Sequence, residues 1–126
     1  MQAVIYAKNA AHLARFYEQV LGLTPLEAGA GFVHLHAEGI ELTVVAMPPH
    51  LAATVELQEP PLAREDTPIK LSFRVDCLQA SAPLVSQCGG RMQAPESAWV
   101  WREQRHLDGL DPEGNVFQLR ENIRFE

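Results

Sequence analysis

The sequence has few of the features that mark secreted, membrane-spanning or metal-clustering proteins. Its only two cysteines, Cys77 and Cys88, are too few for a disulfide framework and lack the grouping of a zinc ribbon. We expect both to be small buried or half-buried residues rather than a redox pair. No apolar run approaches the ~20 residues that span a bilayer. Lys8 and Asn9 interrupt the first apolar stretch, unlike a secretory signal, so a cytoplasmic location is expected.

Basic residues are also scarce. Ten Lys and Arg stand against 16 Asp and Glu, which gives a net charge of −6. Binding to a phosphate backbone needs clustered Lys and Arg, and the sequence has no such cluster. We therefore expect neither nucleic acid nor a membrane as a partner, and the acidic excess is assigned to solubility alone.

The chain does contain two segments with the same order of elements. Residues 3–7 form a β-prone segment, and Asn9 is a good N-cap for a helix that Gly22 ends. Apolar residues recur along one face of that helix. Strands are predicted over residues 32–37 and 40–47, joined by a tight turn at residues 38–39.

The second segment repeats this order. Residues 69–75 alternate as a strand, Asp76 stands where Asn9 stood, and Gly89 follows at the same distance as Gly22 follows Asn9. This equal spacing indicates an internal duplication. Pro83 predicts a helix that begins late or irregularly. Further strands are predicted over residues 99–101, 104–110 and 116–119.

Between the two segments, residues 48–68 carry five prolines and are expected to be mostly a linker, with a strand conceivable within residues 54–57. The length suits one compact domain. We accordingly predict a single domain over residues 1–126, with module one at 1–48, the linker at 49–67 and module two at 68–126.

Three local motifs resemble those of the vicinal oxygen chelate superfamily, which includes glyoxalase I, bleomycin-resistance proteins, fosfomycin-resistance enzymes and extradiol dioxygenases. They are the FYEQVLGL run at residues 16–23, the segment from Val75-Asp76 to Gly89-Gly90, and the DPEGN turn at residues 111–115. The resemblance implies an α+β fold in which two tandem βαβββ modules form a cupped mixed sheet with helices on its outer face. It also implies a homodimer in which each cup takes one module from each subunit.

The resemblance further implies a metal held by one side chain from each of four strands. The matching positions are Gln2, Glu41, Lys70 and Gln118. Glu41 suits a metal, but the ammonium of Lys70 has no lone pair to coordinate one. We therefore expect no metal and no other cofactor, with Lys70 in the metal's place, paired with Glu41 and donating to Gln2 and Gln118. The alternatives are an error of register or a metal site rebuilt from His34, His36 and Glu41.

Strand alternation predicts what else lines the cup. Lys70, Ser72 and Arg74 share one face, and Lys70 with Arg74 would hold a carboxylate or phosphate unless Arg74 lies at the rim beside a surface acid. Trp99 and Trp101 form either an aromatic wall for a planar ligand or a dimer contact, with simple packing as the alternative. His34 and His36 alternate along one strand and therefore point the same way. They would serve as metal ligands, as a general base, or only as polar residues on the solvent-facing side of the strand.

The favoured hypothesis is a metal-free small-molecule-binding protein of the bleomycin-resistance type, whose ligand is anionic or partly aromatic. Its binding residues would include Lys70, Arg74, Trp99 and Trp101. The alternative is a lyase, isomerase or dioxygenase of the same superfamily, in which Glu41 serves as base or metal ligand. A third hypothesis is an interaction domain with a filled, inactive cup.

Overall fold

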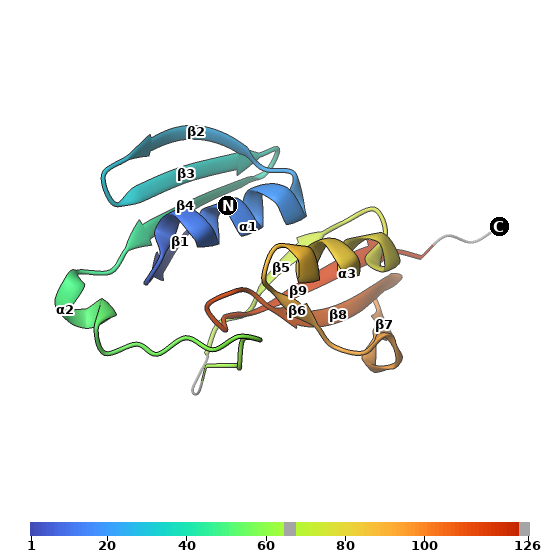
Figure 1. The fold of residues 1–126 in the computed structure, drawn as a ribbon. Helices are drawn as coiled ribbons and strands as arrows, with labels where there is room; N and C mark the ends of the chain where they lie inside the picture. The colour runs from blue at the N-terminus through green and yellow to red at the C-terminus, as the bar shows by residue number, and fades with distance from the viewer. Residues whose placement is uncertain (65–67, 124–126) are drawn as a thin grey trace.

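The computed structural model describes residues 1–64 and 68–123 and contains two β-sheets, each with a helix on one face (Figure 1). The strands are β1 (Gln2–Ala7), β2 (Thr24–Gly29), β3 (Phe32–Ala37), β4 (Ile40–Ala46), β5 (Leu71–Arg74), β6 (Arg91–Met92), β7 (Trp99–Trp101), β8 (Gln104–Leu110) and β9 (Val116–Asn122). The helices are α1 (Ala10–Leu21), α2 (Pro49–Ala52), α3 (Leu78–Gln87) and the short 3₁₀ helix η1 (Pro95–Ser97).

The first sheet has the order β1-β4-β3-β2, with β1 parallel to β4 and the other pairs antiparallel. Its apolar residues alternate, and Leu35, Leu42 and Val44 face α1 and are fully buried. β3 has the predicted bounds. β2 was not predicted, because all six of its residues are exposed and Pro25 interrupts its pattern.

The second sheet has the order β5-β9-β8-β6, and β7 pairs with the other end of β8. β5 is parallel to β9, as β1 is parallel to β4, so the predicted mixed sheets of an α+β fold are confirmed. β5 is shorter than the predicted 69–75, and β9 extends beyond the predicted 116–119.

The helix caps differ between the two halves. Asn9 caps α1 as predicted, because its side chain accepts a hydrogen bond from the amide of His12, and Gly22 ends the helix with φ of 67°. Asp76 is not the corresponding cap. Cys77 occupies that position, and the carboxylate of Glu121 accepts the Leu78 amide at 2.8 Å instead.

Two further expectations about this region were wrong. α3 is not irregular, since it continues through Pro83; the carbonyl of Gln79, which loses its usual partner there, belongs to an exposed residue and can bond to water. Cys77 is exposed rather than buried, because it sits at the start of the helix, whereas Cys88 is half-buried as expected.

Helix α1 packs against both sheets. It contacts β1, β3 and β4 and also α3. Its two aromatic residues reach the second sheet, with ring centroids 5.7 Å apart for Phe16 and Phe117 and 6.0 Å apart for Tyr17 and Phe73. These rings belong to one continuous core that joins the two sheets. The FY pair of the predicted helix motif is therefore the junction between the two halves.

The connecting segment is largely irregular, as expected of a linker. It contains the short helix α2, and no strand forms within residues 54–57. Its far end is fixed to the DPEGN turn, because the amide of Arg64 donates to the Gly114 carbonyl at 3.0 Å and the Arg64 Nε donates to the Glu113 carbonyl at 3.1 Å. The linker therefore follows a defined path along the second half.

Candidate functional site

Each sheet has a polar face opposite its helix. On the first sheet, Gln2 lies beside Glu41, and His36 lies beside Glu41 on the other side. His34 lies beside Thr43, with its Nδ1 2.6 Å from Thr43 Oγ1. Residues directly opposite one another in a ladder share a face, so both histidines lie on the face that carries Gln2 and Glu41.

The polar face of the second sheet carries a continuous hydrogen-bond network. The Lys70 ammonium lies 3.0 Å from the Asp108 carboxylate. The Gln118 side chain is 9% exposed, donates from Nε2 to Asp108 at 3.4 Å, and accepts at Oε1 from Ser72 Oγ at 2.7 Å. Arg120 Nη1 donates in turn to Ser72 Oγ at 3.1 Å. Five polar side chains are thus held in place by one another.

His106 joins this network to the tryptophans. Its Nδ1 lies 3.0 Å from Gln118 Oε1, and its Nε2 lies 3.1 Å from the Trp101 carbonyl. The ring stacks on Trp99 with centroids 5.5 Å apart and an interplanar angle of 13°. Lys70 Nζ lies 5.4 Å from the centre of the same indole, a cation–π distance. Trp99 is therefore fixed by a histidine and a lysine, while remaining 39% exposed.

Within a single chain, the predicted ion pair between Lys70 and Glu41 does not form. Lys70 pairs with Asp108, and Glu41 takes part in no ion pair between described residues. The reason is topological, because Glu41 belongs to the first sheet and Lys70 precedes a strand of the second. Gln118 does lie near Lys70, but Asp108 links them, and Gln2 lies on the first sheet beside Glu41.

The four positions that the resemblance assigns to a metal do not fit a divalent cation. Lys70 offers only N–H donors, and the side-chain oxygen of Gln118 already faces Ser72 and His106. The alternative set of His34, His36 and Glu41 shares one face, yet no group of three or more His, Cys, Asp or Glu gathers as a metal site in the described part of the chain.

Three residues of this polar face were not predicted as site residues from the sequence. Asp108 and His106 come from β8, where they alternate with the buried Leu107. Arg120 follows Gln118 by two residues on β9, so the two side chains share a face of the strand. The sequence signal was the alternation within residues 104–110, but a strand's pattern does not reveal which strand lies beside it.

A second group of polar residues is buried between the two halves. The Tyr17 hydroxyl donates to Asp111 Oδ2 at 2.7 Å, and Asp111 Oδ1 accepts the amides of Glu113 and Asn115. Burial raises the pKa of Asp111, although these hydrogen bonds oppose the rise. Burial, the charge of Asp111 and the shared hydrogen bond raise the pKa of Tyr17. This group is assigned to folding because it faces the core.

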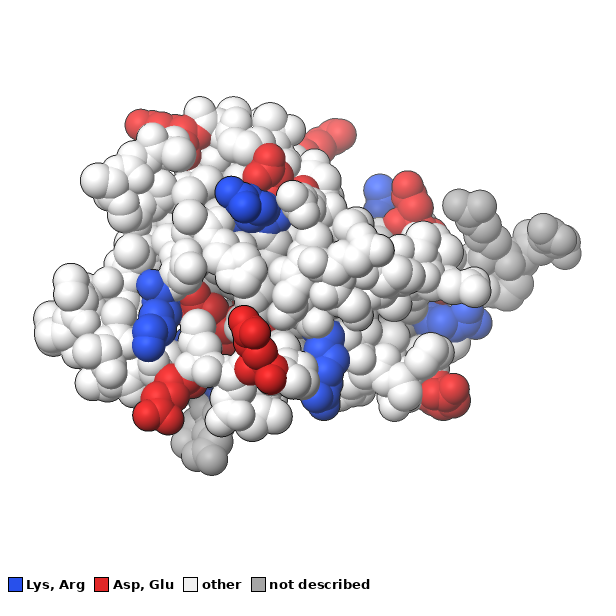
Figure 2. Space-filling model, in the orientation of Figure 1, with Lys and Arg blue, Asp and Glu red and all other residues white. Residues whose placement is uncertain are grey.

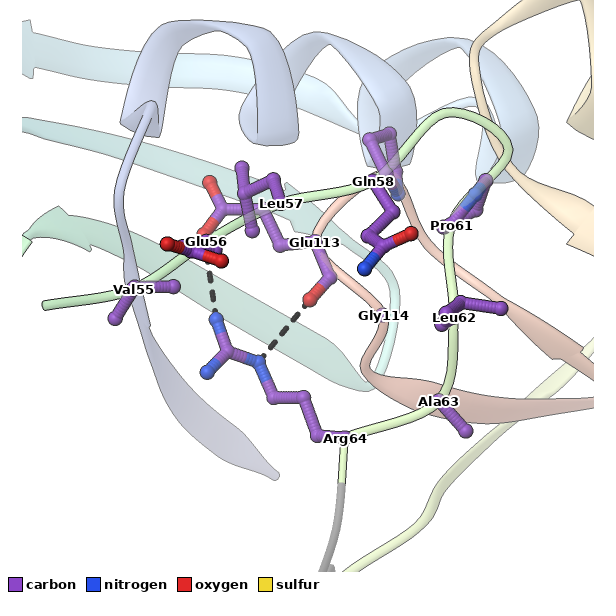
Figure 3. Close-up of a pocket in the computed structure, with 11 residues that line it drawn as sticks. Val55, Glu56, Leu57, Gln58, Pro61, Leu62, Ala63, Arg64, Glu113 and Gly114 are labelled. Carbon is purple, nitrogen blue, oxygen red and sulfur yellow. Dashed lines mark hydrogen bonds and ion pairs between the residues drawn. The ribbon is translucent and has the colours of Figure 1, made fainter.

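The neighbouring Glu113 closes a cavity of about 220 Å³ beside the linker (Figure 3). Arg64 points toward Glu113, with Nη2 3.6 Å from Oε1, and Val55 and Leu57 also line the cavity. The Glu113 carboxylate also accepts the amides of Lys8 at 2.7 Å and Asn9 at 2.8 Å. The hydrogen-bonding capacity of Glu113 is thus used to attach the linker and the start of α1. We therefore assign this cavity to the stability of the fold rather than to ligand binding.

Charge is dispersed over the surface shown in Figure 2, where basic side chains are separated from one another by acidic and uncharged ones. Among the described residues, no helix is long and apolar enough to cross a bilayer.

Two βαβββ-type halves with helices on one face of each sheet and polar side chains on the other define a glyoxalase-type fold. A family model for the glyoxalase-like domain matches residues 2–120, and the chain belongs to this family. The resemblance to the vicinal oxygen chelate superfamily is thereby confirmed. No curated protein matches the sequence significantly.

Solved structures agree with this fold. A glyoxalase/bleomycin resistance protein/dioxygenase family enzyme from Burkholderia phytofirmans PsJN has a TM-score of 0.71 at 19% identity, with 97% of each chain covered. The fosfomycin resistance protein FosX from Mesorhizobium loti has a TM-score of 0.69 at 15% identity, covering 97% of this chain and 90% of that one. A bleomycin resistance determinant encoded on transposon Tn5 has a TM-score of 0.62 at 18% identity, covering 97% and 96%.

Proposed function

We propose that this protein is a metal-free small-molecule-binding protein of the glyoxalase/bleomycin-resistance type. The observation that carries the proposal is Lys70. Its ammonium stands where the resemblance places a metal ligand, and it is held by Asp108 at 3.0 Å and by the Trp99 ring. Removal of Asp108 would leave the Lys70 charge unpaired, although water would offset part of the loss because the Lys70 side chain is 39% exposed.

The ligand surface would consist of the fixed polar face and the exposed indoles. Trp101 is 58% exposed, and aromatic side chains that present an open face are frequent in small-molecule pockets. Lys70, Ser72, Arg74 and Gln118 supply the polar contacts. Part of each indole is left for a planar ligand group, because His106 covers only one side of Trp99.

A second copy of the chain would complete the cup. Gln2 and Glu41 share no hydrogen bond or ion pair with Lys70 or Gln118 in the described residues, so one chain alone does not assemble the two halves of the predicted site. The polar face of the first sheet also exposes Tyr6 and Val4, by 62% and 54%. A homodimer would cover this surface and bring Glu41 to the other chain's Lys70. The single-domain organisation and the cytoplasmic location remain predictions.

No observation favours the enzymatic alternative. A carboxylate base at Glu41 would rely on burial to raise its basicity. Glu41 is exposed in the single chain, and in the proposed homodimer it would face the Lys70 ammonium, which favours the charged and less basic carboxylate.

Elemental analysis of the purified protein tests the metal-free state. We expect no stoichiometric nickel, zinc, iron or manganese, and Lys70→His should gain affinity for nickel or zinc. Lys8→His, at an exposed lysine outside the polar faces, is the matched control and should gain none. Stoichiometric metal in the unaltered protein would overturn the proposal. Unchanged metal affinity in Lys70→His would show that the positional assignment is wrong.

Tryptophan fluorescence tests the binding function. Titration with a panel of aromatic acids and aromatic alcohols should change the emission of the wild type, and Trp99→Phe should remove part of the response. A silent titration across the panel would favour the filled-cup hypothesis instead.

A further inference from the structure

The polar face of the second sheet contains two guanidinium groups that no carboxylate neutralises within the described residues. Arg74 on β5 and Arg120 on β9 are direct neighbours in the parallel ladder and lie on the same face. Like charges placed directly opposite one another across a sheet are unfavourable. Such a pair is stabilised when an anion lies between the two groups.

Three basic groups of the linker and the second half have carboxylate partners, whereas Arg91 and Arg102, which lie outside the cavity described below, have none among the described residues. Lys70 lies 3.0 Å from Asp108, Arg64 lies 3.6 Å from Glu113, and Arg105 lies 3.4 Å from Glu121 on the opposite face. No ion pair between described residues involves Arg74 or Arg120. The sequence predicted that Arg74 and Lys70 together hold an anion. Because Asp108 offsets the charge of Lys70, Arg120 replaces Lys70 as the partner of Arg74 in anion recognition.

Arg120 is also fixed in orientation. Its Nη1 donates to Ser72 Oγ at 3.1 Å, and the Ser72 hydroxyl donates in turn to Gln118 Oε1 at 2.7 Å. A guanidinium carries five N–H donors, so most remain available after this one contact. A held, planar donor fork is suited to binding a carboxylate or a phosphonate through two oxygens.

Both arginines line a cavity of about 490 Å³ at the edge between the two sheets. Ser72 also lines it from β5, Gly39 comes from the β3–β4 turn, Ile40 is the first residue of β4, and Leu23 follows the end of α1. The only carboxylate among its lining residues is Glu38, which is exposed on the turn. One acid against two guanidiniums leaves the cavity with a net positive charge inside a chain of net charge −6.

We infer that Arg74 and Arg120, with Ser72, form an anion-binding subsite for the carboxylate or phosphonate group of a small ligand. This inference rests on the proposed binding function and specifies its ligand class: a molecule with one acidic group and an aromatic or apolar remainder. The acidic group would lie in the cavity, and the remainder would extend along the polar face toward Trp99.

The test compares phenylphosphonate and benzoate with benzyl alcohol, their uncharged counterpart, by calorimetry and by NMR titration. Wild type should bind the two anions more tightly than the alcohol, and added salt should weaken this preference. Arg74→Gln and Arg120→Gln should each weaken anion binding about 10- to 100-fold, the loss expected of a charge-assisted hydrogen bond. Binding of benzyl alcohol should change less than about twofold.

Two further variants support the comparison. Arg105→Gln removes an arginine on the opposite face and should leave anion binding unchanged. Arg74→Lys retains the charge but not the fork, so its loss should be smaller than that of Arg74→Gln. Arg74 and Arg105 are exposed, so substitutions at these two positions should preserve the fold.

The outcomes separate the two proposals. Binding of all three probes without dependence on Arg74 or Arg120 would overturn the anion subsite and leave the binding function standing. No binding of any probe would overturn both. Sedimentation velocity adds a last criterion: if the arginine variants lose dimerisation rather than anion affinity, a partner's carboxylate occupies the cavity and the ligand assignment is wrong.

Discussion

Replacement of Glu113 should destabilise the fold by disconnecting its two halves. This side chain belongs to the β8–β9 turn and is 4% exposed, yet it accepts the amides of Lys8 at 2.7 Å and Asn9 at 2.8 Å, which open α1 in the other half. Hydrogen bonds to a charged group contribute about 1.5–3 kcal/mol each. Lys8 and Asn9 are exposed, so water would partly replace the lost acceptor. We expect Glu113→Ala to lower the free energy of unfolding by about 2–4 kcal/mol.

Urea unfolding followed by circular dichroism measures this loss. The midpoint should fall while the m-value stays unchanged, because the surface exposed on unfolding is nearly the same. Glu113→Gln keeps the size and one acceptor but directs an NH₂ group at a backbone amide, so we expect a loss of about 2 kcal/mol. Glu27→Gln, on an exposed strand, is the control and should change stability by less than about 0.5 kcal/mol. If Glu113→Ala behaved like this control, the reasoning would be refuted.

Two more predictions concern Asp111, which is buried, and Gly90, which is half-buried. Burial raises the pKa of Asp111, so between the unfolded and folded pKa values the native state holds more protons than the unfolded chain. The contribution of Asp111 to stability therefore decreases as pH rises from about 4. Urea midpoints of wild type and Asp111→Asn across this range should show the advantage of the wild type shrinking with pH, and a growing advantage would contradict the predicted sign. Gly90→Ala should lower the free energy of unfolding by about 1–3 kcal/mol in the same assay, because the added Cβ would lie 2.6 Å from the Leu110 carbonyl oxygen and 2.6 Å from the Phe16 ring. The control Ala80→Gly, at an exposed helix position, should lower it by no more than about 1 kcal/mol.

Local patterns predicted the elements whose faces differ in polarity. The alternation of residues 32–37 gave β3 its bounds, and Asn9 and Gly22 gave α1 its ends. β2 was missed because an exposed strand carries no apolar alternation to detect. The cap at Asp76 was wrong because the duplicated spacing was applied too strictly to the second helix, where Glu121 supplies the acceptor from another strand.

For the candidate site, the sequence predicted which side chains share a face of one strand, but not which strands lie side by side. Alternation grouped Lys70, Ser72 and Arg74 on one side of the strand, and the structure puts Gln118 of β9 directly beside Ser72 on that side. Alternation did not reveal that β8 would bring Asp108 to Lys70, because the order of strands in a sheet is set by the whole topology. The role of Glu113 was missed for the same reason, since its partners lie more than a hundred residues earlier in the chain.

The position of Phe16 and Tyr17 has a consequence for any attempt to divide the protein. A polypeptide that ended after β4 would leave two large rings in water, and one that began at β5 would lack the surfaces that Phe73 and Phe117 rest against. Neither fragment would be expected to fold by itself. Mixed together they would have reason to associate, since each fragment holds half of the same interior.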